Sequence, residues 1–327
     1  MSDFLPIPAE SLAAQPEEAA TEAAKPPPLV SIVIPTHDRP EYLILALKSA
    51  RAQTYENIEI IISDNSSGTA SREAIADQLA ADPRVSYSAL DGGGYMENWL
   101  NGLGQAKGEY VNFLMDDDLF HPQKVERMAH YFTGYPSVSL VTSFRDLIDG
   151  AGRPILPILG THRLFEDDTV VLGNSMAEAM LKQGTNLIGE PTTAMFRRRD
   201  IGAGFGRFCN RQYQTMSDTA TWMTLLHNRH CVYLPQPLSS FRLHGGQDQR
   251  KKSTAINANC EWLQILLDGH QNGLYILKDE DFRALLMLKL TAFLPYLVSE
   301  HEEIRNGDYK GEEMQLLIRR AFGYLLQ

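Results

Sequence analysis

Four short apolar segments alternate with three helical segments between Leu29 and Asp118, and this alternation restricts the fold more than any other feature of the chain. The residue patterns predict strands at 29–34, 58–62, 85–90 and 110–115, and helices at 40–50, 71–80 and 95–106. Pro35 ends the first strand in this interpretation, and Asp38 is a candidate cap for the first helix. Strands joined through helices pair in parallel by right-handed crossovers. The sequence therefore predicts an α/β fold with a mostly parallel, twisted sheet flanked by helices.

Polar residues follow three of the predicted strands, at 36–38, 63–65 and 116–118. The carboxyl ends of parallel strands share one edge of a sheet, and ligands of such folds bind there. The last cluster is three consecutive aspartates, whose mutual repulsion requires a nearby cation. Mg²⁺ and Mn²⁺ prefer oxygen ligands and commonly bridge to phosphates, so the triplet predicts a divalent metal beside a diphosphate. The competing interpretation is a solvated acidic turn in which Asp118 caps the helix after Pro122.

The segments 30–40 (VSIVIPTHDRP), 60–67 (IIISDNSS) and 106–118 (AKGEYVNFLMDDD) stand in a characteristic order and spacing. Over roughly residues 29–245, the chain resembles the inverting family two of GT-A-fold glycosyltransferases. The resemblance implies a GT-A fold and a hexosyltransferase-type enzyme. Such an enzyme moves a sugar from a nucleotide-diphosphate donor, typically a UDP-sugar, to an acceptor hydroxyl. Mg²⁺ or Mn²⁺ is the cofactor that the resemblance implies.

The resemblance also implies roles for individual residues. Thr36 and the neighbouring backbone would border the nucleobase. Asp64 would accept a hydrogen bond from the base, and an Asx turn is the structural alternative for this residue. Further donor-binding residues are implied at Pro35, Asp38, Arg39, Asn98, Asp116 and Asp117. Many family members have aspartate where this chain has Met115, so the triplet starts one residue later here. We favour Asp118 as the direct metal ligand.

Two later segments complete the predicted site. Asp218 opens a predicted helix at 218–227, where the family places its catalytic base. An inverting transferase needs a carboxylate to take the proton of the attacking hydroxyl. The structural alternative for Asp218 is a helix N-cap. In FRLHGGQ, Arg242 is implied to hold the diphosphate and His244 to ligate the metal. Residues 190–193 are a candidate lining of the acceptor side.

Two other functions remain compatible with the sequence. A sugar nucleotidyltransferase uses a related sheet and metal-binding aspartates, but it usually carries a Gly-rich basic loop that 35–40 (PTHDRP) lacks. A non-catalytic nucleotide-sugar-binding scaffold would require neither the intact triplet nor Asp218. The acceptor could be a glycan, a lipid-linked saccharide or a protein, because no short motif identifies it.

Composition divides the chain into three regions. We expect a disordered Ala-, Pro- and Glu-rich leader at 1–28, a transferase domain at 29–250 and a helical region at 251–327. The net charge of −11 argues against a general nucleic-acid binder. Three cysteines without a CxxC pair, and no signal-peptide pattern, predict a cytoplasmic protein.

The C-terminal region contains more apolar residues than an exposed tail tolerates. Its most apolar stretch, 284–298, is interrupted by Lys289 and Pro295 and is shorter than the ~20 residues that span a bilayer. We therefore expect the C-terminal helices to pack against the same chain, a second subunit, a peripheral membrane surface or an acceptor.

Overall fold

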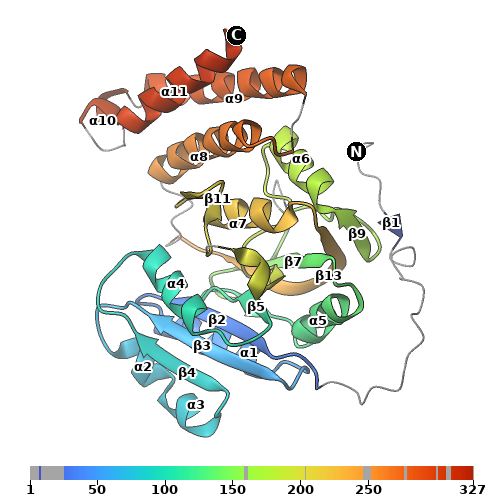
Figure 1. Cartoon of the computed structure of the whole chain (residues 1–327). Helices are drawn as coiled ribbons and strands as arrows, with labels where there is room; N and C mark the ends of the chain where they lie inside the picture. The colour runs from blue at the N-terminus through green and yellow to red at the C-terminus, as the bar shows by residue number, and fades with distance from the viewer. Residues whose placement is uncertain are drawn as a thin grey trace.

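The computed structural model describes residues 7–8, 26–157, 161–202, 204–245, 252–275, 278–299, 301–306 and 311–326. A curved central sheet is flanked by helices, and a further group of helices from the C-terminal region lies above it in Figure 1. Within the described residues the sheet has eleven strands, and its main path runs β1-β9-β13-β7-β10-β5-β2-β3-β4. Most of the leader expected at 1–28 lies outside the described residues.

The parallel half of the sheet was predicted correctly. Its strands are β5 (Tyr110–Phe113), β2 (Val30–Thr36), β3 (Ile58–Asp64) and β4 (Val85–Ala89), each parallel to the next. The helices that connect them are α1 (Pro40–Arg51), α2 (Ala70–Ala74), α3 (Ala76–Ala81) and α4 (Tyr95–Gln105). Val33 enters the core on one face of β2, and Ile32 and Ile34 enter it on the other. This is the pattern of a strand buried on both faces.

The predicted end of the first strand at Pro35 was wrong, because β2 continues to Thr36. Val33 accepts the Leu114 N–H on the side of β2 that faces β5. Pro35, two residues later, faces the same side, but the β2–β5 ladder has already ended at Val33. The missing N–H of Pro35 therefore removes no ladder hydrogen bond, and the strand can extend toward the sheet edge.

Two helix predictions in this half also need correction. The helix expected at 71–80 is two short helices divided at Ile75. Asp38 does not cap α1, since the N-cap residue is Arg39 and its side chain makes no capping hydrogen bond. Asp38 instead has a positive φ of 51°, in the left-handed region that Asp tolerates better than most residues.

The second half of the sheet mixes strand directions. β10 (Met195–Arg197) lies antiparallel between β5 and β7 (Val138–Asp149), and β13 (His230–Leu243) runs parallel to β7. β9 (Thr169–Leu172) pairs with β13 and with β1 (Ile7–Pro8), both antiparallel. The short strands are β6 (Leu119–Phe120), β8 (Pro154–Ile155), β11 (Arg207–Phe208) and β12 (Arg211–Gln212). The order of β5, β10, β7 and β13 brings late segments of the chain beside the acidic triplet.

Helices cover both faces of the sheet (Figure 1). The additional ones are α5 (Lys124–Gly134), α6 (Gly173–Gln183), the 3-10 helix η2 (Arg198–Ile201) and α7 (Ser217–Leu226). Leu43 of α1 and Met128 of α5 pack on the face that receives Ile32. Met180 of α6 and Trp222 of α7 pack on the opposite face.

The C-terminal helices are α8 (Lys252–Gln271), α9 (Asp279–Ser299), α10 (His301–Asn306) and α11 (Gly311–Leu325). α8 joins the same core cluster as α7 through the buried residues Trp262, Leu263, Ile265, Leu266 and Leu267. Phe282 and Leu286 of α9 belong to this cluster as well. Packing against the same chain, one of the expected outcomes, is thus what α8 and the inner face of α9 show.

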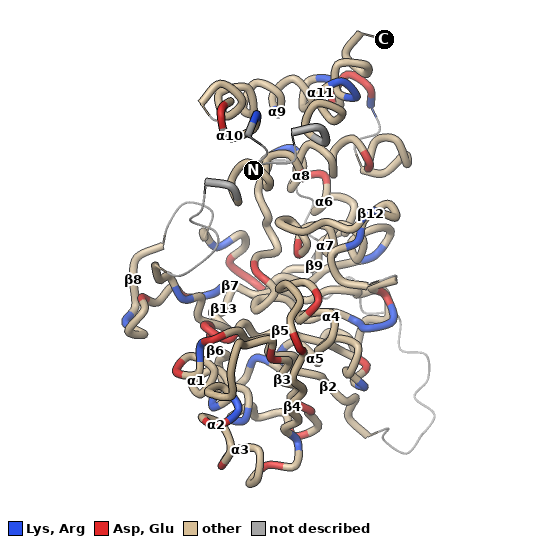
Figure 2. The backbone as a smooth tube through the Cα atoms, turned by 90° about the vertical axis from the view of Figure 1, so that its left-hand side faces the viewer, with Lys and Arg blue, Asp and Glu red and all other residues tan. Residues whose placement is uncertain are grey.

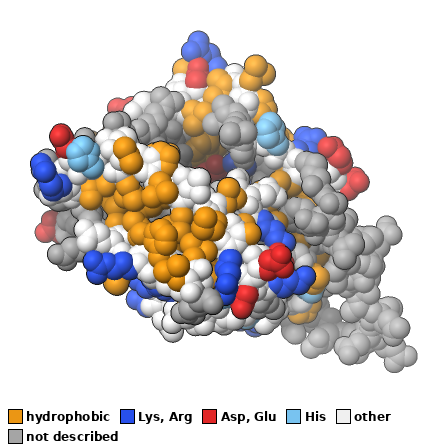
Figure 3. Space-filling model, turned by 90° about the horizontal axis from the view of Figure 1, so that it is seen from above, with side chains coloured by type: hydrophobic (Ala, Val, Ile, Leu, Met, Phe, Trp, Pro, Cys, Tyr) orange, Lys and Arg blue, Asp and Glu red, His pale blue; other side chains and the backbone are white. Residues whose placement is uncertain are grey.

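The outer face of α9 and α11 is apolar and exposed. Figure 3 shows hydrophobic side chains gathered on the surface seen from above, where these two helices lie in Figure 1. The exposed large side chains there are Met287, Leu288, Leu294, Tyr296, Val298, Leu316, Phe322 and Leu326. Among the described residues, α9, with 21 residues, is the single helix that is long and apolar enough to cross a membrane. By length and composition alone α9 could therefore span a bilayer, although the stretch 284–298 by itself is shorter than a span.

Candidate donor and catalytic site

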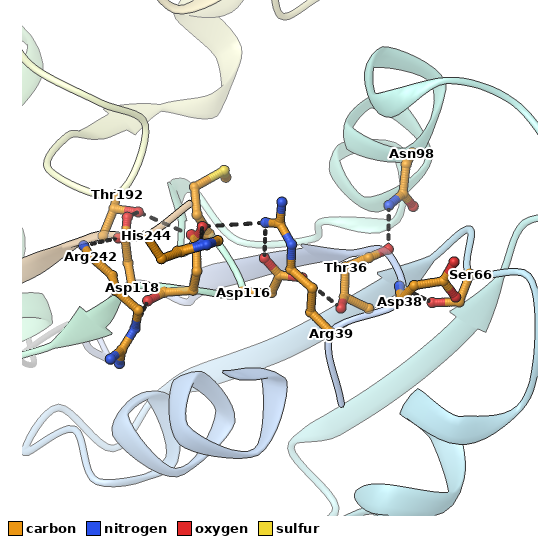
Figure 4. Close-up of polar contacts among 12 residues, drawn as sticks. Thr36, Asp38, Arg39, Ser66, Asn98, Asp116, Asp118, Thr192, Arg242 and His244 are labelled. Carbon is orange, nitrogen blue, oxygen red and sulfur yellow. Dashed lines mark hydrogen bonds and ion pairs between the residues drawn. The ribbon is translucent and has the colours of Figure 1, made fainter. Parts of the chain in front are cut away.

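The three polar clusters predicted from the sequence meet at one edge of the sheet. Thr36 and Asp64 are the last residues of β2 and β3, and the acidic triplet, Asp116 to Asp118, follows β5. The Thr36 hydroxyl donates a hydrogen bond to Asp116 Oδ2 at 2.8 Å. The close-up in Figure 4 shows Thr36, Asp116 and Asp118 in a row along the ends of the strands. The convergence follows from the parallel order of the strands.

Arg39 supplies a positive charge to the acidic triplet from the start of α1. Its guanidinium lies 3.2 Å from Asp116 Oδ1 and 3.3 Å from Asp117 Oδ2. Burial, followed by the charge of Asp117, raises the pKa of Asp116 to about 6, although Arg39 and Thr36 oppose the shift. Acidic and basic residues of distant segments lie side by side near β6 and α1 (Figure 2). The repulsion expected within the triplet is thus partly compensated by the chain itself.

Asp118 is fully buried, and both of its carboxylate oxygens accept hydrogen bonds. Oδ2 accepts the Thr192 hydroxyl at 2.5 Å, and Oδ1 accepts the backbone N–H of Arg242 at 2.9 Å. Burial and the neighbouring charge of Asp117 hold the pKa of Asp118 well above its usual range. The alternative in which Asp118 caps the next helix is wrong, because the N-cap of α5 is Gln123. Through these two hydrogen bonds, Asp118 links the segment after β5 both to the segment before β10 and to β13.

The side chain of Arg242 is 1% exposed and contacts Asp117, Asp149 and Tyr42. Its Nε donates to the carbonyl of Asp117 at 2.6 Å, and an Nη donates to the carbonyl of Asp149 at 3.2 Å. The guanidinium also stands 4.9 Å from the centre of the Tyr42 ring. These contacts hold the acidic triplet in place. The predicted contact of Arg242 with a diphosphate stays a prediction.

His244 follows β13 and faces the middle aspartate of the triplet. Its Nε2 lies 3.0 Å from Asp117 Oδ2, and its ring centre is 5.0 Å from that of Tyr42. In the described part of the chain, no group of three His, Cys, Asp or Glu side chains is arranged to hold a metal ion. The predicted metal ligand Asp118 is not the carboxylate next to His244. The pair that could share a metal in this structure is Asp117 and His244.

Asp64 lies at the end of β3 and is 2% exposed. Oδ1 accepts the N–H of Ser66 at 2.7 Å, which is the Asx turn considered for this residue. Oδ2 accepts the hydroxyl of Tyr87 at 2.7 Å. Burial, followed by this hydrogen bond, raises the pKa of Tyr87. The turn is present, and the nucleobase contact of Asp64 stays a prediction.

Asp38 and Asn98 connect the loops that follow β2 and β3. The Asp38 carboxylate accepts the Ser67 N–H at 3.0 Å and the Ser67 hydroxyl at 2.9 Å. The Asn98 amide donates to the carbonyl of Thr36 and to Asn65 Oδ1, both at 3.0 Å. Asn98 is buried on α4 and supports these loops, and its predicted donor contact stays a prediction.

Asp218 lies in the first turn of α7 and does not cap it, since the N-cap residue is Met216. Its Oδ1 accepts the Thr219 N–H at 2.6 Å, and its Oδ2 accepts the Asn186 amide at 2.9 Å. Burial raises the pKa of Asp218 to about 6, and the charge of Glu190 acts in the same direction. A carboxyl with this pKa is ionised at neutral pH and still basic enough to accept a proton.

Several residues from Asn186 to Thr192 contact Asp118 or Asp218, although the sequence assigned none of them an individual role. Glu190 pairs with Arg145 at 2.8 Å, and its charge also raises the pKa of Asp118. Because the charge of Glu190 raises the pKa of both Asp118 and Asp218, it couples the acidic triplet electrostatically to Asp218. Lys124 is a further unpredicted residue, buried near Asp118, and its pKa is lowered by burial. These contacts join residues that are far apart in the sequence, so no local sequence pattern indicates them.

Comparison with known proteins identifies the same class. A sequence model described as "Glycosyl transferase family 2" matches residues 31–205, more than half of the chain. An uncharacterized glycosyltransferase of Rickettsia felis is 27% identical over 273 residues, covering 82% of this chain and 42% of that relative. A Campylobacter jejuni protein named GalNAc(5)-diNAcBac-PP-undecaprenol beta-1,3-glucosyltransferase is 37% identical over 93 residues, 28% of this chain and 30% of that one. The chain thus spans less than half the length of these relatives.

Solved structures share the fold. Residues 1–349 of S. aureus TarS in complex with UDP-GlcNAc align with a TM-score of 0.59 and 16% identity, covering 90% of this chain and 81% of that one. The mannosyltransferase PcManGT from Pyrobaculum calidifontis, in complex with GDP-Man and Mn²⁺, aligns with a TM-score of 0.53 and 15% identity, covering 92% and 88%. At these identities the likeness concerns the fold.

Proposed function

Because the chain belongs to glycosyl transferase family 2, we propose that it is a metal-dependent, inverting glycosyltransferase that uses a UDP-sugar. The observation that carries the proposal is the meeting of the acidic triplet with Arg39 and His244 at the carboxyl edge of the sheet. Asp218 supplies a carboxylate of raised pKa from a separate element. Donor binding and proton transfer are thus assigned to different groups.

Asp117 and His244 would hold the metal. Carboxylate oxygen and imidazole nitrogen both suit Mn²⁺, and Mg²⁺ usually keeps only one or two protein carboxylates beside phosphates and water. Two protein donors are therefore a sufficient set for an ion that also binds the donor diphosphate. When bound, such an ion neutralises the charge of the departing diphosphate. Asp118, our favoured ligand from the sequence, is better suited to fixing the triplet, because its oxygens already accept the hydrogen bonds of Thr192 and Arg242.

Asp218 would act as the general base. The acceptor hydroxyl oxygen forms a bond to the anomeric carbon, the bond from that carbon to the diphosphate breaks, and Asp218 takes the hydroxyl proton. Attack opposite to the leaving group inverts the configuration, and no covalent intermediate with the protein is needed. The hydrogen bonds from Asn186 and Thr219 leave Asp218 fixed in orientation, which favours directed proton transfer.

The substrates are proposed by similarity. The TarS complex contains UDP-GlcNAc, which supports a UDP-sugar donor here. The C. jejuni relative is named for an undecaprenol-linked acceptor, so we place a lipid-linked saccharide before other glycans and proteins. We propose a cytoplasmic location because the three cysteines of the sequence are an odd number and form no CxxC pair.

A donor screen tests the proposal. Release of UDP or GDP is measured across a panel of nucleotide sugars with Mn²⁺, and the anomeric configuration of the product is read by NMR. We expect turnover of a UDP-sugar with inversion. Retained configuration would refute the inverting mechanism. Binding of UDP without turnover of any donor would favour the scaffold alternative, and pyrophosphate release from UTP and a sugar 1-phosphate would favour the nucleotidyltransferase.

A further inference from the structure

Two carboxylates of α8 lie against the segment that precedes α7, the helix that carries Asp218. Glu261 and Asp268 stand two helical turns apart on α8, so their side chains lie on the same face. That face contacts residues 211–216, which run from β12 to the start of α7. α8 lies beyond the residues that match the family, which end at 205.

Glu261 binds the backbone at the N-terminal end of α7. Its Oε1 accepts the N–H of Gln214 at 3.0 Å, and its Oε2 accepts the N–H of Met216 at 2.7 Å. Met216 is the N-cap residue of α7, and its side chain makes no capping hydrogen bond. The N–H groups at a helix start need acceptors, and negative charge is favourable there. Glu261, which belongs to α8, supplies both the hydrogen-bond acceptors and the negative charge.

Asp268 fixes the other end of the same segment. The residue is 5% exposed, and its Oδ2 accepts Arg211 Nε at 2.7 Å and the Tyr213 hydroxyl at 2.9 Å. Its Oδ1 accepts an Nη of Arg320 from α11 at 2.7 Å. Burial alone would raise the pKa of Asp268, but the hydrogen bonds from Arg211, Arg320 and Tyr213 outweigh it and lower the pKa. The carboxylate therefore stays ionised and joins β12, α8 and α11.

We propose that Glu261 and Asp268 are positioning residues for Asp218. They hold segment 211–216, and through it the first turn of α7, where the Asp218 carboxylate must meet the acceptor hydroxyl. The proposal rests on the proposed role of Asp218. Asp218 lies two residues after Met216 in the same turn, so a displacement of Met216 moves Asp218 with it. A misplacement on the order of 1 Å in a reacting group can reduce the rate ~10²-fold.

We expect donor binding not to depend directly on these two carboxylates. Glu261 and Asp268 accept hydrogen bonds from segment 211–216 and from Arg320, which lie outside the acidic triplet. The triplet is instead fixed by β13 and by the segment before β10. Loss of the α8 carboxylates should therefore lower kcat and leave donor affinity unchanged.

The test uses Glu261→Gln and Asp268→Asn in the full chain, with Glu280→Gln on the exposed start of α9 as the matched control. For each variant we would measure kcat and donor KM by UDP release from the sugar that wild type turns over, and the UDP Kd by calorimetry. We expect kcat to fall about tenfold or more, with KM and Kd within about twofold. Hydrogen exchange should be faster in the peptides that cover 211–220, and the control should match wild type.

Two results would overturn the proposal. One is an unchanged kcat in both folded variants. The other is a loss of UDP affinity equal to the loss of kcat, because that indicates a general structural role. If wild type turns over no nucleotide sugar, the proposed function fails separately. Hydrogen exchange then decides the positioning claim by itself, and unchanged protection of 211–220 in Glu261→Gln and Asp268→Asn would overturn it.

Discussion

The pH dependence of turnover gives the sharpest test of the catalytic assignment. Burial raises the pKa of Asp218 to about 6, and a general base must be deprotonated to act. With that pKa, the ionised fraction falls from about nine-tenths at pH 7 to about one-tenth at pH 5. We therefore expect kcat to fall roughly tenfold over this interval. A carboxyl with an ordinary pKa would lose less than about a tenth of its ionised form over the same range.

The assay is UDP release at saturating donor and Mn²⁺, measured from pH 4.5 to pH 8. Asp116 also has a pKa of about 6, so UDP affinity is measured by calorimetry at each pH to separate donor binding from proton transfer. Glu190→Gln provides a second check. Removing the negative charge of Glu190 favours the ionised form of Asp218 and should move the acid limb of kcat to lower pH. A kcat that stays flat down to pH 5, with UDP still bound, would refute the assignment.

Three further predictions follow from the site and the core. Asp218→Asn should lower transfer by roughly 10²–10⁴-fold with UDP affinity kept, and a near-wild-type rate would contradict the base role. UDP should bind about tenfold more weakly in EDTA than in Mn²⁺, and His244→Ala should remove the difference; equal affinity in wild type would exclude the metal. In urea unfolding, Trp262→Ala should cost about 3–5 kcal/mol because α8 belongs to the core, against no measurable change for the exposed Thr291→Val.

The parallel half of the fold could be predicted because its evidence is local. The strands β2, β3 and β5 are short apolar runs, and each ends at or a few residues before one of the three polar clusters. The position of the acidic triplet beside Thr36 follows from strand order alone. The end of β2 was misjudged because the effect of Pro35 depends on whether β5 still pairs beside it, and no local pattern records that.

The rest of the site could not be predicted because its contacts join distant segments. The repulsion within the triplet indicated a nearby cation, and the Arg39 guanidinium meets part of that need. The choice of Asp118 as metal ligand stays a prediction, and the sequence could not show that its oxygens accept hydrogen bonds from Thr192 and Arg242. Likewise, the role of α8 in holding the start of α7 depends on packing between helices. Sequence periodicity shows that α8 is helical and says nothing about which loop its carboxylates reach.

The long strand β13 has a consequence for the order in which the protein becomes active during synthesis. Asp118 obtains one hydrogen-bond partner 74 residues later, at Thr192, and another 124 residues later, at Arg242. Loops of that length close at an entropic cost that must be met before the contact stabilises anything. The acidic residues therefore leave the ribosome long before the groups that fix them. A growing chain that already contains β2 to β5 still lacks a finished donor site, which is completed when β13 has been made and has paired with β7.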